Sequence, residues 1–210
     1  MGRESGRLTF DAMSHVYKWD GRVVPSVTQI LAAEGLVEMG GSAEKLAYAR
    51  DLGTAVHVAC ELDAKGDLDE DSVAEVVRPY LAAYRRFCAD TDFVPTLVEH
   101  RVYHEQLGYA GTSDLLGHIR KRRGRARQWV LPDIKSGFKR RATGPQTAAY
   151  WQALPSVARL EAQGCHRYGL YLRDDGAYDF VLYDDPNDVH VFNAALQLYF
   201  WKGRTPSCPT

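Results

Sequence analysis

The sequence GTSD at residues 111–114 and the sequence DIK at residues 133–135 decide how this chain folds. The residues between them are two apolar-rich runs, over 115–119 and 128–134, separated by a strongly basic stretch. Runs of this length bounded by polar residues predict two neighbouring strands. We expect the chain to reverse direction near Arg123-Gly124.

Such a reversal sets Asp114 directly opposite Asp133. Like charges that face each other across an antiparallel pair destabilise the sheet, and a cation between them removes that penalty. Lys135 lies two residues beyond Asp133 and therefore projects from the same strand face. The three groups predict a site for a hard metal ion and for phosphodiester hydrolysis. A short D-x-K motif also occurs by chance, so other motifs are needed to support this interpretation.

Outside this pair of strands, the periodicity alternates between helices and strands and favours one α/β domain over residues 1–210, with a mixed central β-sheet covered by helices. We expect a loosely ordered N-terminus, a ribbon over 10–24 and a short tail over 205–210. The other expected elements are helices over 25–31, 42–65, 71–89, 145–163 and 187–202, and strands over 96–104, 109–119, 128–135, 167–172 and 178–183.

Two prolines and an aromatic cluster qualify the expected helices. Pro79 predicts a kink or division of the second long helix, and Pro155 predicts a break in the helix after DIK. In the last helix, the neighbouring aromatic residues over 199–201 are expected to pack inward, because aromatic helix faces are usually core.

Bulk properties exclude several classes of protein. The chain has 210 residues, 45% hydrophobic and 25% charged, and a net charge of -1, which is unlike a protein that coats nucleic acid without selection. No apolar run is long enough to span a membrane, and the first residues lack the apolar core of a secretory signal, so we expect a cytoplasmic protein. The four cysteines are scattered and show no C-x-x-C spacing, which argues against zinc and iron–sulfur sites.

Two helical pairs of polar residues lie near the expected site. His57 and Glu61 are four residues apart on one helix face, with Arg50 and Gly53 one or two turns earlier. A neutral imidazole can ligate a divalent metal, although pairs with this spacing are also common on solvent-exposed helix faces.

Gln146 and Tyr150 share a face in the first turns of the helix after DIK, where backbone N–H groups favour anions such as phosphate. Their alternative role is capping and packing. Glu99 lies on the strand before Asp114, and without a known register it points either toward the metal or to solvent.

Basic residues flank the expected site on both sides. The run over 120–127, with Arg122 and Arg123, and the triplet Lys139-Arg140-Arg141 offer local positive charge for DNA phosphates. A charged hairpin tip that simply remains solvated is the alternative for the first run.

Taken in their order along the chain, the motifs resemble the PD-(D/E)xK nuclease superfamily, in particular its RecB-like exonuclease branch with compact phage and prophage members. The resemblance extends from about residue 10 to about residue 183 and rests on eight positions: Gly53, His57, Glu61, Asp114, Asp133, Lys135, Gln146 and Tyr150. It implies a restriction-endonuclease-like core and a nuclease that uses Mg²⁺ or Mn²⁺. Asp133 departs from the pattern, because many relatives have Glu at this position.

The resemblance also implies residue roles. Asp114, Asp133, the carbonyl of Ile134 and His57 would ligate the metal, and Lys135 would position or polarise the attacking water. Gln146 and Tyr150 would orient Lys135 and contact DNA, with Arg50 and the basic residues as further DNA contacts. Glu61 and Glu99 would lie in the outer shell. No iron–sulfur cluster is expected, because the C-terminus carries only Cys208.

The function expected from these motifs is an exonuclease on linear DNA in recombination, repair or phage replication, with a single-strand-annealing or other recombination protein as a partner. The alternatives are a structure-directed endonuclease on flaps or junctions and a non-catalytic DNA-binding module on the same fold. The sequence leaves the oligomeric state open.

Overall fold

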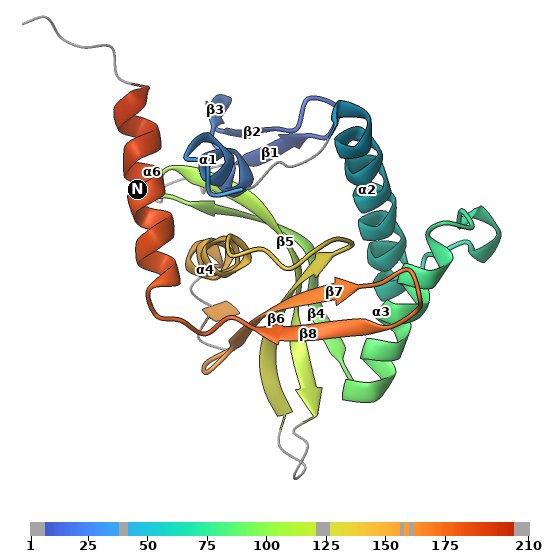
Figure 1. The fold of residues 1–210 in the computed structure, drawn as a ribbon. Helices are drawn as coiled ribbons and strands as arrows, with labels where there is room; N and C mark the ends of the chain where they lie inside the picture. The colour runs from blue at the N-terminus through green and yellow to red at the C-terminus, as the bar shows by residue number, and fades with distance from the viewer. Residues whose placement is uncertain (1–6, 38–41, 121–126, 156–157, 160–161, 204–210) are drawn as a thin grey trace, which may run out of the picture.

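A five-stranded mixed sheet forms the centre of the molecule, with the strand order β4-β5-β6-β7-β8 (Figure 1). Neighbouring strands are antiparallel except β6 and β7, which are parallel and joined through α4. The bounds are β4 Val94–His104, β5 Tyr109–Arg120, β6 Arg127–Lys135, β7 His166–Leu172 and β8 Tyr178–Leu182. This computed structural model describes residues 7–37, 42–120, 127–155, 158–159 and 162–203.

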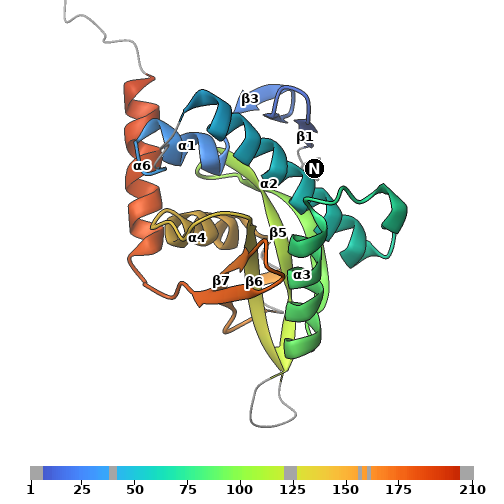
Figure 2. The ribbon, with the colours of Figure 1, turned by 45° about the vertical axis from the view of Figure 1, so that its right-hand side comes forward.

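Helices cover both faces of this sheet (Figure 2). Side chains of β5 and β6 alternate between the two faces, since Leu115 and Val130 belong to one apolar cluster and Leu116 and Leu131 to the other. The first cluster is closed by α2 (Ala43–Lys65) and α3 (Arg78–Thr91), and the second by α1 (Val27–Ala33), α4 (Thr143–Ala153) and α6 (Asp188–Lys202). Burial of both faces explains why these strands lack a simple apolar–polar alternation.

A small antiparallel sheet packs beside β4 and β5. Its strands are β1 (Leu8–Asp11), β2 (Val16–Trp19) and β3 (Arg22–Val24), and Asp20-Gly21 forms the β2–β3 turn with positive φ at both residues. Trp19 stacks on Tyr103 of β4 with ring centroids 4.1 Å apart. The polar residues Ser26 and Gln29 then start α1 with a capping box.

The expected α/β class and mixed central sheet are confirmed, as are the division at Pro79 and the break at Pro155, whereas the expected bounds of two helices are wrong. The expected helix over 71–89 is a short 3₁₀ turn (Glu70–Ser72) followed by α3, and Pro79 lies in the first turn of α3, where its missing N–H has no intrahelical partner to lose. α4 ends at Ala153 rather than continuing to 163, and the predicted break at Pro155 is the reason, because Leu154 precedes this proline and is held in an extended conformation (φ -59°, ψ 144°).

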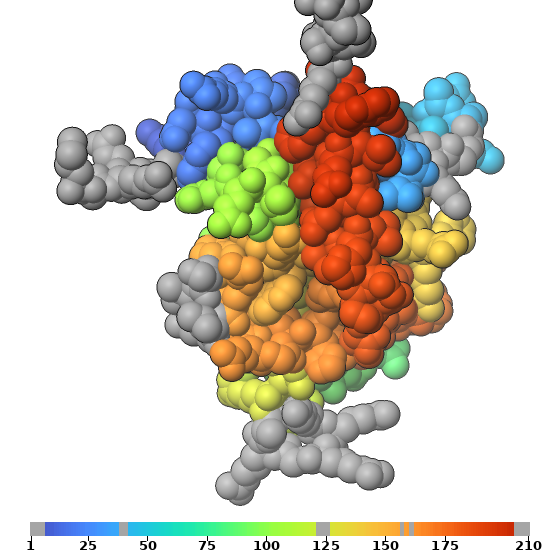
Figure 3. All heavy atoms as spheres, turned by 90° about the vertical axis from the view of Figure 1, so that its left-hand side faces the viewer, coloured from blue at the N-terminus to red at the C-terminus, as the bar shows by residue number. Residues whose placement is uncertain are grey.

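α6 forms an exposed ridge on one side of the molecule, and the expected inward packing of its aromatic end is confirmed only in part (Figure 3). Phe192, Ala195 and Leu196 are its buried residues, whereas Trp201 is 68% exposed and Phe200 is 39% exposed. Of the aromatic residues over 199–201, Tyr199 packs against the second apolar cluster as expected, whereas Phe200 and Trp201 face outward.

Several expectations fall on residues outside the described ranges. These are the loosely ordered N-terminus, the C-terminal tail, and the reversal at Arg123-Gly124 with the two DNA contacts Arg122 and Arg123. No helix among the described residues has the length and apolar character to cross a membrane.

Candidate metal centre

Three acids occupy one row across three neighbouring strands. On β4 and β5, Val98 pairs with Leu115 and His100 pairs with Ser113, so Glu99 faces Asp114 between them. On β5 and β6, the register of the last pair, Gly117–Val130, extended by three residues on each strand sets Asp114 at the level of Asp133. Carboxylates from β4, β5 and β6 are therefore brought together although they are far apart in the sequence.

The expected facing pair of Asp114 and Asp133 needs one refinement. The β5–β6 ladder ends at Gly117–Val130, three residues short of the acids. Beyond that point, Asp114 Oδ2 accepts a hydrogen bond from the backbone N–H of Ile134 at 2.6 Å. The Asp114 carboxylate thus binds the Ile134 N–H, which a regular β5–β6 ladder would pair with a backbone carbonyl of β5. This hydrogen bond holds the carboxylate against the backbone of β6. The expected role of the Ile134 carbonyl as a metal ligand stays a prediction.

His57 of α2 completes a group of three ligand-type side chains. Its Nδ1 lies 3.7 Å from Asp114 Oδ1 and 3.8 Å from Glu99 Oε1, and one ligand atom from each of the three side chains lies within 4.8 Å of the others. Two atoms that bind one small divalent ion at about 2.1 Å are separated from each other by about 3 to 4 Å. The three side chains therefore have the spacing that a shared cation requires.

Glu99 adopts a backbone conformation that is rare for its residue type. Its φ is +46°, in the left-handed region that side chains other than glycine seldom occupy. Conformations of this kind cost about 1 to 3 kcal/mol and persist where the surrounding structure requires them, often at functional sites. In this conformation the Glu99 carboxylate lies within the group formed with Asp114 and His57, and its expected outer-shell role stays a prediction.

Asp133 and Lys135 form the second part of the site. Lys135 Nζ lies 2.5 Å from Asp133 Oδ2, as predicted from their common strand face. The Asp133 side chain is only 2% exposed, and its Oδ1 has no hydrogen-bond partner among the described residues. A buried carboxylate oxygen without a donor is costly, so the donor set fits a cation that would satisfy it.

The electrostatics of the acid row agree with this fit. Burial raises the pKa of Asp133 to about 6, although Lys135 opposes the shift, and burial also raises the pKa of Asp114. Burial lowers the pKa of His57, but Asp114 and Glu99 more than compensate, and the pKa of His57 rises to about 9. In the metal-free protein, the Lys135 ammonium and the His57 imidazolium thus offset the negative charge of the acids. A divalent ion that binds there would displace the proton of His57.

The Gln146–Tyr150 pair of α4 lies beside the acids. Gln146 Nε2 donates to Tyr150 Oη at 3.1 Å, as the helical spacing predicted. Burial raises the pKa of Tyr150, and the charges of Asp133 and Asp114 add to the shift. The Tyr150 ring packs directly on Gly111, where an added Cβ would lie 2.7 Å from Cε1, which gives the glycine of the GTSD sequence a steric role.

The structure adds a chain of hydroxyl groups that the sequence did not indicate. Tyr171 of β7 pairs with Lys135 in the parallel ladder, and its Oη lies 3.1 Å from Thr143 Oγ1 and 2.7 Å from Tyr183 Oη. Tyrosines in strands are usually packing residues, so only the register reveals that Tyr171 stands next to the lysine. Tyr17 of β2 similarly reaches Thr112, with 2.7 Å between the two hydroxyl oxygens.

Other residues expected near the site lie apart from the acid row. Glu61, one turn along α2 from His57, pairs with Lys65 at 2.5 Å, and its expected outer-shell role stays a prediction. Arg50 is exposed and lies 3.4 Å from Asp51. Lys139 pairs with Asp179 at 3.2 Å. Arg140 and Arg141 are exposed in the segment between Lys135 and α4, and whether these cations contact DNA stays a prediction.

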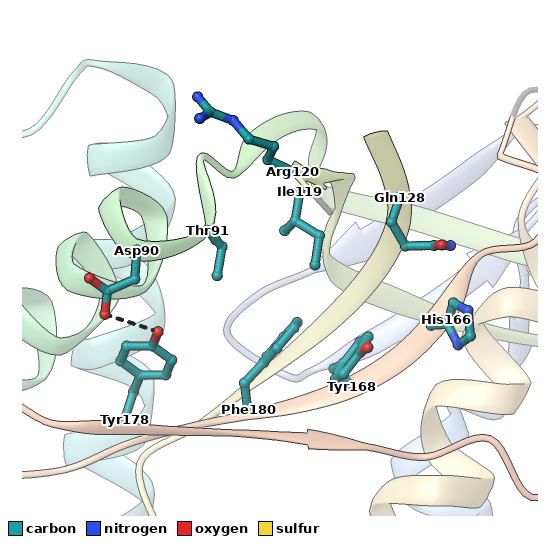
Figure 4. Close-up of a pocket in the computed structure, with 9 residues that line it drawn as sticks. All are labelled: Asp90, Thr91, Ile119, Arg120, Gln128, His166, Tyr168, Tyr178 and Phe180. Atoms are coloured by element: carbon teal, nitrogen blue, oxygen red, sulfur yellow. Dashed lines mark hydrogen bonds between the residues drawn. The ribbon is translucent and has the colours of Figure 1, made fainter. Parts of the chain in front are cut away.

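A separate cavity of about 740 Å³ opens where α3, β5, β6, β7 and β8 meet (Figure 4). Tyr168 and Phe180 stack in its wall with ring centroids 3.8 Å apart, and Tyr178 Oη donates to Asp90 Oδ2 at 3.2 Å. None of the acid-row residues lines this cavity. The candidate metal centre therefore lies outside this cavity, where α2 meets strands β4, β5 and β6.

Comparison with known proteins gives little information about this chain. No protein-family model and no curated protein matches the sequence. Among solved structures, the chain is similar to an alkaline exonuclease, LHK-Exo, from Laribacter hongkongensis, with 16% sequence identity. The match covers 85% of this chain and 91% of that one, with a TM-score of 0.29. At this level of similarity it carries no argument, and the interpretation of the site rests on the chain's own geometry.

Proposed function

We propose that this chain is a metal-dependent nuclease that hydrolyses phosphodiester bonds in DNA. The observation that carries the proposal is the row of Glu99, Asp114 and Asp133, with His57 at one end and Lys135 at the other. Hydrolysis of a phosphodiester requires an activated water and stabilisation of an anionic transition state, and this row brings together groups suited to both.

In this proposal, His57, Glu99 and Asp114 hold Mg²⁺ or Mn²⁺, and Asp133 adds a carboxylate from the adjacent strand. When bound, the ion supplies Lewis-acid activation of water and charge stabilisation. Oxygen ligands together with one imidazole suit both of these hard ions, and Mn²⁺ tolerates the imidazole better. His57 must lose its proton to ligate the ion, which links metal binding to pH.

Lys135 and the α4 pair act on the substrate. The Lys135 ammonium, held by Asp133, offers a point charge to the scissile phosphate and orients the attacking water. Tyr150 keeps its proton, because its pKa is raised, and can donate a hydrogen bond to a phosphate oxygen. Gln146 fixes the orientation of that hydroxyl.

Within this activity, we propose an exonuclease on linear DNA that serves recombination, repair or phage replication, alongside a single-strand-annealing or other recombination protein. The support is the resemblance to the RecB-like branch of the PD-(D/E)xK superfamily in the ordered motifs. The position of Glu99 opposite Asp114 supports a further carboxylate in the metal site.

Digestion of linear, closed circular and branched DNA, with Mg²⁺, Mn²⁺ or a chelator, tests the proposal. Wild type should shorten linear DNA only when metal is present, and Asp114→Asn and Lys135→Ala should lose cleavage by about 10³-fold or more. Glu61→Gln is the matched acidic control and should cleave like wild type. Intact DNA under all conditions, or equal cleavage by Asp114→Asn, would refute a nuclease. Cleavage of closed circles or junctions would replace the exonuclease with an endonuclease.

A further inference from the structure

The segment from Ser136 to Ala142 joins Lys135 to α4 and is held at both ends. At its start, Ser136 packs against Gly53 of α2, where an added Cβ on the glycine would lie 3.4 Å from Ser136 Oγ. Toward its end, the Arg140 carbonyl accepts a hydrogen bond from Tyr183 Oη at 3.4 Å. Lys139 pairs with Asp179 between these points. The segment is thus tied to α2 on one side and to β8 and its C-terminal flank on the other.

Phe138 lies between the two attachments and is 91% exposed. Single exposed apolar side chains are normal on protein surfaces. Phe138 differs from such residues in its position, because it lies three residues after Lys135 and directly before the cations Lys139, Arg140 and Arg141. An exposed aromatic ring beside positive charge is the combination with which proteins hold unpaired nucleic acid strands.

We propose that Phe138 stacks on an unpaired nucleobase of the DNA strand that enters the metal centre. The inference rests on the proposed function and deepens it by naming the substrate form, a single strand or a frayed end. Bases inside an intact duplex are already stacked on both faces, so no ring face is free to stack on Phe138. An unpaired base has such a free face. The neighbouring cations would hold the phosphates on either side, without sequence preference.

A binding experiment in chelator tests this inference without cleavage. The probes are a single-stranded oligonucleotide with 2-aminopurine at either end or in the middle, and a duplex closed by a hairpin at both ends. Wild type should quench the fluorescence of the single strand when it binds. Phe138→Leu, which keeps an apolar side chain but removes the ring, should lose that quench and bind the single strand about 5- to 150-fold more weakly.

Two further variants separate stacking from a structural effect. Phe138→Tyr keeps the ring and should retain both affinity and quench. Trp201→Ala removes an exposed aromatic from α6 and should leave both unchanged. The melting temperature of Phe138→Leu should equal that of wild type, because the side chain is almost fully exposed in the protein alone.

The outcomes of this test are distinct from those of the nuclease test. Equal affinity and equal quench in Phe138→Leu and wild type overturn the stacking role, while metal-dependent cleavage by both would leave the proposed function intact. A loss of duplex affinity equal to the loss of single-strand affinity also overturns it. Wild-type protein that neither binds nor cleaves any DNA overturns the proposed function, and the stacking role with it.

Discussion

Glu99 and Asp114 face each other across β4 and β5, and Glu99 reaches this position with a left-handed backbone at φ +46°. His57 Nδ1 lies at nearly the same distance from both carboxylates, 3.8 and 3.7 Å. A strained acid that faces a second acid and shares an imidazole with it has no evident packing role. A cation bound between the three groups would account for this relationship.

The first prediction concerns the two glutamates near His57. Glu99→Gln should weaken Mn²⁺ binding by about 10-fold or more, since the loss of an outer-shell partner alone typically costs 10- to 100-fold. Glu61→Gln should leave metal affinity within about 2-fold, because Glu61 pairs with Lys65 instead. Calorimetric titration of both variants with Mn²⁺ checks this. Equal losses in the two variants would remove Glu99 from the metal site.

The second prediction separates metal ligands from the catalytic lysine. Lys135 Nζ lies 2.5 Å from Asp133 and competes with any other cation for that carboxylate. Lys135→Ala should therefore bind Mn²⁺ at least as tightly as wild type while it loses cleavage, whereas Asp114→Asn should lose both. The measurements are Mn²⁺ affinity and single-turnover cleavage on the same preparations. Weaker metal binding by Lys135→Ala would show that the lysine supports the metal site.

The third prediction is a pH dependence of metal-induced stability. The folded protein holds protons on Asp133 up to about pH 6 and on His57 up to about pH 9, in each case above the ordinary value of the group. Both shifts stabilise the metal-free fold at low pH, and this stabilisation is lost as pH rises through about 6 and then about 9. Metal must displace these protons, so its stabilising effect should increase with pH.

At about 100 times its Kd, a ligand stabilises a fold by about 2.7 kcal/mol, or about 5 to 11 °C for a chain of this size. Melting curves with and without a fixed Mn²⁺ concentration should therefore differ more at pH 8.5 than at pH 6. In His57→Gln the metal-dependent difference should be smaller and should vary less over this range. A difference that is larger at pH 6 would contradict the assignment of His57 as a ligand.

The fourth prediction concerns the glycine that begins the GTSD sequence. Gly111→Ala would place a methyl group 2.7 Å from the Tyr150 ring, so either the ring or β5 must shift. Overpacking of this kind costs about 1 to 3 kcal/mol, and it should also reduce cleavage because Tyr150 moves.

Gly137→Ala is the matched control for this substitution, because an added Cβ there meets no atom within 4 Å. It should leave both stability and cleavage unchanged. Urea unfolding and cleavage assays on the two variants check the prediction. Equal stability of Gly111→Ala and wild type would show that Tyr150 is free to move away from β5.

The sequence by itself determined the features that depend on local periodicity. The period of a strand put Lys135 on the same face as Asp133, and the period of a helix joined Gln146 to Tyr150. The mixed order of strands and helices was also predicted, because apolar patterns specify it.

Only the tertiary structure decided which distant groups meet. Glu99 and Glu61 were equivalent candidates in the sequence, but the register of β4 against β5 placed Glu99 in the acid row, and Lys65 paired with Glu61. Strand register and the rotation of a helix about its axis are set by the burial of apolar faces on both sides of the sheet. Because a one-residue slip would turn Glu99 to the other face, its role depends on packing and not on any motif around it.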